Sequence, residues 1–181
     1  MKTKAEVRNE SKRRVNLLTE EEKSKASSEI CDQLLQFLKT RSANTIGIYL
    51  ALPDEVNLSR AYETLLKQGI TLALPFPGTD SHWDFHTIDT LKPRTHGEWG
   101  LGFPPQVQPI DSNELDVILV PGRAFTPQGD RVGRGKGIYD RLLADTKAMK
   151  IGVCFSCQMI KELPTDAHDI RMDRVVRSSR S

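Results

Sequence analysis

Residues 116–143 read DVILVPGRAFTPQGDRVGRGKGIYDRLL. The stretch begins with an apolar run, residues 117–120, which a Pro-Gly pair ends, and this pattern predicts a buried strand. It closes with Ile138, Leu142 and Leu143 at the spacing of one helical face. A buried strand that leads into a helix is a building unit of α/β folds.

Between this strand and helix lies the glycine segment, which we define as residues 131–139, RVGRGKGIY. Glycines at a helix start leave backbone N–H groups open to an anion, and Arg131, Arg134 and Lys136 add full positive charges. The segment therefore predicts a phosphate site. The alternative is a surface turn whose basic side chains are solvated.

Two known glycine signatures do not fit the glycine segment. A Walker A loop has a glycine where this chain has Asp130, and it has Ser or Thr after the lysine, where Gly137 stands. A dinucleotide fingerprint follows its strand directly, whereas a longer loop separates the strand from the glycines here. The segment therefore predicts a phosphate site of another kind.

Strands and helices alternate outward from this stretch, which predicts one domain over residues 1–181 with an α/β fold and a largely parallel sheet. The sequence pattern places helices at 4–18, 19–39 and 58–67, and strands at 45–52, 70–76, 83–88, 150–155 and 172–176.

Composition limits the class of protein. Charged residues make up 28% of the chain, hydrophobic residues 38%, and the formal net charge is +2. These values are typical of a globular protein and do not indicate a nucleic-acid partner. No apolar run approaches the length of a membrane span, and the basic N-terminal residues lack the apolar core that a signal peptide would need. Three cysteines, an odd number, argue against a disulfide framework. We expect a cytoplasmic protein without a membrane partner, as a monomer or possible homodimer.

A second cationic feature lies near the N-terminus. Lys4 and Arg8 are four residues apart, so both cations share one face of a predicted helix and can clamp a polyphosphate. The alternative is a solvated, frayed arm, which is common for a basic terminus.

The motif Pro-Gly-x-Ala-Phe at 121–125, followed by Gly-x-Arg-x-Gly-x-Gly-x-Gly-x-Tyr-Asp-Arg at 129–141, resembles the 5-formyltetrahydrofolate cyclo-ligase family. The resemblance implies a three-layer α/β/α sandwich, and an enzyme that uses ATP and Mg²⁺. It also covers Lys4 and Arg8, which match a Lys-x-x-x-Arg motif that contacts ATP in the family.

The resemblance implies three sets of binding residues, all present in this chain. The ATP set is Lys4, Arg8, Arg131, Val132, Gly133, Arg134, Gly135, Lys136, Gly137, Ile138 and Tyr139. The folate set is Leu50, Glu55, Arg134, Gly135, Lys136, Gly137 and Ile138. Trp99 is added as a candidate on other grounds, because it is an aromatic residue in a glycine-rich loop. The metal set is Asp140 and Asp169.

The resemblance also implies the chemistry: the γ-phosphoryl group of ATP moves to the formyl oxygen of 5-formyltetrahydrofolate, and nitrogen N10 then closes the ring. Arg134, Lys136 and Tyr139 are the expected catalytic residues. Without the resemblance, Asp140 would be an ordinary first-turn helix acid. For Trp99 two alternatives stay open: a lid over the heterocycle, or an aromatic side chain that packs under a long loop.

Two departures from the family pattern leave alternatives open. Phe103 stands where the family has an acidic residue, and Ile138 where it commonly has an aromatic one. A divergent member that binds nucleotide or folate with little ligase activity would fit these changes. A nucleic-acid-binding module that uses the basic N-terminal face is the other alternative, and the small net charge disfavours it.

Overall fold

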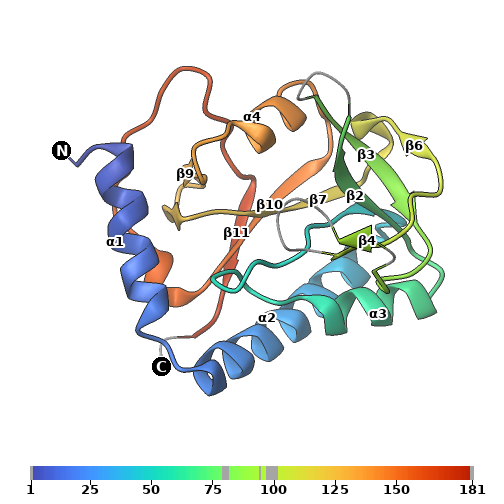
Figure 1. The fold of residues 1–181 in the computed structure, drawn as a ribbon, viewed down its shortest axis with the longest axis horizontal. Coiled ribbons are helices and arrows are strands. Elements are labelled where there is room, and N and C mark those ends of the chain that lie inside the picture. The colour runs from blue at the N-terminus through green and yellow to red at the C-terminus, as the bar shows by residue number, and fades with distance from the viewer. Residues whose placement is uncertain (1, 79–81, 94, 97–101, 180–181) are drawn as a thin grey trace.

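The computed structural model describes residues 2–78, 82–93, 95–96 and 102–179. Its main sheet has the strand order β11-β10-β7-β1-β2-β3-β6 (Figure 1). The strands of this sheet are β1 (Thr45–Gly47), β2 (Thr71–Pro77), β3 (Trp83–Ile88), β6 (Pro109–Ile110), β7 (Val117–Pro121), β10 (Met149–Cys154) and β11 (Arg174–Arg177).

The five strands from β11 to β2 are parallel, and β3 and β6 add an antiparallel edge. Two small antiparallel pairs complete the described strands: β4 (Thr95–His96) with β5 (Gly102–Phe103), and β8 (Ala124–Phe125) with β9 (Arg131–Val132). The predicted α/β fold with a largely parallel sheet is confirmed.

Helices lie on both faces of the sheet. The α-helices are α1 (Lys4–Asn16), α2 (Glu20–Arg41), α3 (Ser59–Lys67) and α4 (Ile138–Leu142), and two short 3₁₀ helices are η2 (Ser112–Glu114) and η3 (Ser156–Gln158). In Figure 1, α2 and α3 run along one side of the sheet and α4 lies on the opposite side. None of the helices in the described part of the chain has the length and apolar character needed to span a bilayer.

Strand β7 shows how the sequence builds the two sides of the core. Val117 and Leu119 pack into the cluster under α2 and α3, whereas Ile118 and Val120 face the cluster that includes the end of α4. Alternate residues of a strand point to opposite faces, so a continuous apolar run is required where both faces are buried.

Both N-terminal helices begin with a capping box. The Thr19 side chain accepts from the N–H of Glu22, whose carboxylate accepts from the N–H of Thr19, as the sequence predicts. Thr3 and Glu6 make the same pair at the start of α1. The basic N-terminus is therefore an ordered helix, with Val7 among its buried residues, and the frayed-arm alternative is wrong.

Two predicted strands differ from the structure by more than one residue at an end. The strand predicted at 45–52 ends at Gly47; Ile48 donates one further hydrogen bond to Ala73 (2.7 Å), and the chain then leaves the sheet. The residues that follow Gly47 are buried by tertiary contacts rather than by strand pairing. Tyr49, for example, is buried, and its hydroxyl donates to the Val56 carbonyl (2.8 Å). The final strand, predicted at 172–176, is shifted to β11.

The packing of α2 gives a stability prediction. Leu34 is 0% exposed inside the main cluster, whereas Leu17 is 77% exposed. We expect Leu34→Ala to lower the free energy of unfolding by about 2–5 kcal/mol, because it removes buried methyl groups and leaves a cavity. Leu17→Ala is the matched control and should change it by less than about 0.5 kcal/mol. Denaturant titration of both variants checks this, and equal effects would contradict the packing.

The sheet reverses its winding direction between β1 and β7. From β1 the chain crosses through α3 to β2 on one side, and from β7 it continues to β10 on the other side. The loops that follow β1 and β7 therefore diverge and leave a crevice at the carboxyl ends of the strands, the usual ligand position in open α/β sheets.

Candidate active site

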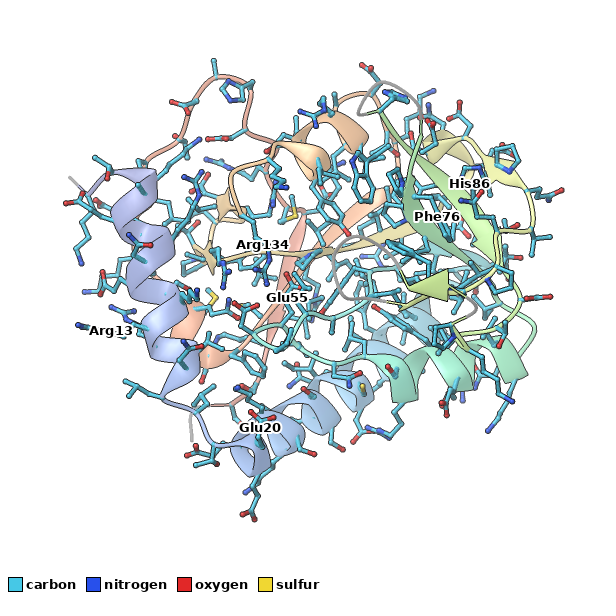
Figure 2. All side chains as sticks on the ribbon, in the orientation of Figure 1. Arg13, Glu20, Glu55, Phe76, His86 and Arg134 are labelled. Carbon is cyan, nitrogen blue, oxygen red and sulfur yellow. The ribbon has the colours of Figure 1, made fainter. Side chains whose placement is uncertain are left out.

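A cavity of about 530 Å³ lies at this crevice. Its lining comes from the loop after β1, the end of β7, helix α1, the glycine segment and the loop before β11. Figure 2 shows Glu55 and Arg134 next to each other at the centre of the molecule. Here the loop after β1 meets the glycine segment.

Helix α1 lies against the glycine segment. Val7 is buried in a small cluster with Ala124, Val132 and Leu163, which fixes the helix beside β8 and β9. One residue on, the Arg8 Nε donates to the Gly133 carbonyl (3.0 Å). The N-terminal cations and the glycine segment thus share one cavity.

Gly135 has a backbone conformation that favours glycine, and it lies next to Arg8. Its φ is +100°, a conformation that residues with a side chain rarely adopt, and an added Cβ would lie 3.4 Å from the Arg8 guanidinium carbon. The alternating glycines therefore let the backbone turn tightly against α1.

The Lys4 ammonium points to the loop before β11. Its Nζ lies 2.7 Å from Asp166 Oδ2 and 2.7 Å from Asp169 Oδ1. Burial opposes ionisation of Asp169, but hydrogen bonds from Lys4 and the Asp166 N–H outweigh it and lower the pKa of that carboxyl. Asp166, His168 and Asp169 bring an oxygen, a nitrogen and a further oxygen within 4.8 Å of one another.

An ion-pair network joins the loop after β1 to the glycine segment. Arg134 donates through Nε to Glu55 (2.8 Å) and through Nη2 to Asp54. The other oxygen of Asp54 accepts from Arg123, which follows β7. Burial opposes ionisation of Asp54, yet the hydrogen bonds from the two guanidinium groups lower its pKa. Asp54 is therefore ionised at neutral pH.

Arg131 is a buried arginine that lines the cavity. It is 6% exposed, and its Nη2 donates to Asp140 (2.6 Å) while its guanidinium carbon lies 5.8 Å from the centre of the Tyr139 ring. Its Nε is buried and has no hydrogen-bond partner among the described residues. Burial raises the pKa of Tyr139, so its phenol stays protonated at neutral pH and can donate a hydrogen bond.

The opposite part of the lining is apolar. Pro75, Trp83 and Phe103 border the cavity, and the Phe103 ring lies 5.2 Å from the ring of Phe76. A cavity with cations on one side and aromatic side chains on another suits a ligand pair of one polyphosphate and one flat heterocycle.

All the predicted site residues in the described part of the chain line this one cavity. These are Lys4, Arg8, Leu50, Glu55, Arg131, Val132, Gly133, Arg134, Gly135, Lys136, Gly137, Ile138, Tyr139, Asp140 and Asp169. Trp99 lies outside the described residues. The two predicted metal ligands have different neighbours among the described residues: Asp169 groups with Asp166 and His168, while Asp140 pairs with Arg131.

Sequence reasoning missed three charged residues of the site: Asp54, Arg123 and Asp166. Asp54 directly precedes Glu55, so an acidic pair at the end of a strand was an available signal. The sequence-based prediction also gave too much weight to the helix dipole at the glycine segment, because α4 has only five residues. The positive potential there must come mainly from side chains and open N–H groups.

The lowered pKa of Asp54 predicts a pH effect on stability. Its carboxylate contributes stability that is fully present above its unfolded pKa and is lost as the pH falls through the lower folded value. We therefore expect Asp54→Asn to destabilise the protein more at about pH 6 than at about pH 3. Denaturant titrations of wild type and variant at both pH values check this; a difference independent of pH would contradict an ionised Asp54.

Comparison with known proteins supports one family. A model described as the 5-formyltetrahydrofolate cyclo-ligase family matches residues 1–178. The 5-formyltetrahydrofolate cyclo-ligase of Mus musculus is 27% identical over 186 residues, which cover 94% of this chain and 91% of that protein. The enzyme of the same name from Mycolicibacterium smegmatis is 33% identical over 150 residues, which cover 77% and 76%.

Two solved structures share the fold. The 5,10-methenyltetrahydrofolate synthetase of Aquifex aeolicus superposes with a TM-score of 0.83 at 31% identity, over 96% of this chain and 89% of that one. The synthetase of Mycoplasma pneumoniae gives 0.79 at 25% identity, over 96% and 97%. With the family model spanning nearly the whole chain, this protein belongs to the 5-formyltetrahydrofolate cyclo-ligase family.

Proposed function

We propose that this protein catalyses the ATP-dependent cyclisation of 5-formyltetrahydrofolate to 5,10-methenyltetrahydrofolate, with release of ADP and phosphate. The observation that carries the proposal is the shared cavity: Lys4 and Arg8 from α1 line it together with the glycine segment. Family membership supports the choice of substrate. Because the reaction consumes ATP and a cellular folate, we assign the protein to the cytoplasm.

The phosphate side of the cavity consists of cations and open backbone. Lys4, Arg8 and Lys136 would hold the triphosphate, with the N–H groups of the glycine segment around it. Phosphoryl transfer depends on positioning and on neutralising charge rather than on covalent chemistry by the protein. This side provides both.

The reaction balances in two steps. The formyl oxygen attacks the γ-phosphorus, the bond from that phosphorus to ADP breaks, and the nitrogen N5 electron pair forms an iminium phosphate. The N10 electron pair then attacks the formyl carbon, the carbon–oxygen bond breaks to release phosphate, and N10 loses its proton. The formyl oxygen, a poor leaving group by itself, thus leaves as phosphate. No side chain acts as a nucleophile.

Charge that develops on the transferred group would be stabilised by Arg134 and Lys136, which come from the glycine segment. Tyr139, a protonated phenol, would donate a hydrogen bond at the place where both substrates meet. These are the roles predicted from the sequence, and the cavity is compatible with them.

The folate side has an acceptor and an apolar wall. Glu55 presents a carboxylate, which suits the amino and N–H donors on one edge of a pterin ring. Leu50 and Phe103 line the same cavity and offer apolar contact to the ring. In the free protein Glu55 holds Arg134, so the incoming ring edge would replace one of its hydrogen-bond donors.

The cavity also offers carboxylate ligands to Mg²⁺. Asp140 and Asp169 both line the cavity and offer carboxylate oxygens, the ligands that Mg²⁺ prefers beside phosphate oxygens. In the free protein Asp140 pairs with Arg131 and Asp169 pairs with Lys4. A bound Mg²⁺ would replace these cations as the positive partner of the carboxylates. When bound, the ion would neutralise phosphate charge.

A direct assay tests the proposal. The purified protein is incubated with 5-formyltetrahydrofolate, ATP and Mg²⁺, and the product is followed by its absorbance while ADP is quantified. We expect one ADP for each methenyl product and no product without ATP. Binding of both ligands with no turnover would instead support the divergent, non-catalytic member that the Phe103 and Ile138 departures allow.

A further inference from the structure

Asp54 connects two guanidinium groups of the cavity without lining it. One of its oxygens accepts from Arg123 and the other from Arg134. Both arginines line the cavity, and Asp54 is not among the described residues that do. Its side chain is 14% exposed. A carboxylate shared in this way sets the distance between two cations and the direction in which they point.

Hydrogen bonds fix both the backbone and the side chain of Arg123 beside the glycine segment. Its N–H donates to the Val132 carbonyl (2.7 Å), one residue before the first glycine of the segment. Its carbonyl accepts from the buried amide of Gln158 (3.1 Å) and from the hydroxyl of Ser11 on α1. With backbone and guanidinium both fixed, Arg123 is a rigid cation at the phosphate side of the cavity.

We propose that Asp54 is a positioning residue that holds Arg123 and Arg134 toward the cavity, and that Arg123 is a further phosphate-binding side chain next to the glycine segment. The proposal rests on the proposed function, because the ligand is the phosphoryl group that moves and then leaves as inorganic phosphate. Two guanidinium groups anchored on one carboxylate can both donate to the oxygens of a single phosphate. Arg134 also contacts Glu55, so the pair lies between the two substrates.

The positioning role is tested with Asp54→Asn. Asparagine keeps the shape but turns one acceptor into a donor that faces a guanidinium group, so one arginine loses its anchor. We expect kcat to fall about tenfold or more, with the KM for ATP changed by less than about threefold, because the arginines would act mainly on the phosphoryl group in transit.

Asp130→Asn is the matched control. Asp130 is also a partly buried aspartate (17% exposed side chain) with an arginine partner, Arg171, but neither residue lines the cavity. We expect its kcat to stay within about twofold of wild type. If both variants lose activity equally, or Asp54→Asn keeps its kcat, the positioning role is refuted.

The phosphate site is tested without turnover. Calorimetric titration of inorganic phosphate into Arg123→Gln should give affinity about tenfold weaker than wild type, because one charged donor is lost. Asp54→Asn should weaken it in the same direction, and the double variant should lose less than the sum of the two, since both act on one site.

Unchanged phosphate binding in Arg123→Gln would overturn the proposal. This readout also decides the matter if Asp54→Asn fails to fold. A wild-type protein that binds phosphate through Arg123 but makes no methenyl product would refute the proposed function and leave the phosphate site standing. The two failures are therefore distinguishable.

Discussion

Lys136→Ala lowers the rate of ATP-dependent formation of methenyltetrahydrofolate by about a hundredfold or more: this is the largest single effect that we expect. Lys136 lies in the glycine segment and lines the cavity with Arg134. A cation aimed at a transferring phosphoryl group stabilises the charge that builds up in the transition state, and removing one such group costs about 3 kcal/mol.

The measurement is steady-state turnover by product absorbance, with thermal unfolding recorded alongside. Lys161→Ala is the control, since Lys161 is an exposed lysine that does not line the cavity. It should leave turnover within about twofold of wild type. Turnover of Lys136→Ala close to wild type would remove this residue from the mechanism.

Glu55→Gln should mainly affect the folate. We expect kcat/KM for 5-formyltetrahydrofolate to fall about fiftyfold, because hydrogen bonds between a carboxylate and donor groups contribute about 1.5–3 kcal/mol, and glutamine places a donor against donors. The KM for ATP should change much less. Glu55 is the acceptor of Arg134, so part of the loss will reflect a less restrained guanidinium group.

Varying each substrate at saturating levels of the other separates these effects. Glu63→Gln, at an exposed position of α3, is the control and should behave as wild type. A fall in ATP affinity with unchanged folate kinetics would show that Glu55 acts on the phosphate side instead, and our division of the cavity would be wrong.

Much of the fold followed from local pattern. The strand β7 was predicted from one apolar run, because a strand buried on both faces needs such a run. The capping box at Thr19 was predicted because its two hydrogen bonds are local in sequence. The length of β1 was not predictable, since the apolar residues after it, such as Tyr49, are buried by tertiary contacts rather than by strand pairing.

The site residues also fall into those that local motifs predicted and those that only the fold brings together. The glycine segment and the cations of α1 were predicted from motifs, and the structure brings them together through the contact of Arg8 with Gly133. The network around Asp54 was not predicted, because its partners Arg123 and Arg134 follow 69 and 80 residues later. A bridging carboxylate has no sequence signature, so only the fold could show that these charges meet.

The central claim is that α1 and the glycine segment enclose one triphosphate. A crystal structure of the protein with a non-hydrolysable ATP analogue and Mg²⁺ tests it most directly. We predict phosphate oxygens in contact with Lys4 and Arg8 on one side and with backbone N–H groups of residues 133–137 on the other. An analogue bound elsewhere, with Arg8 still on Gly133 and no phosphate at the glycine segment, would contradict the claim.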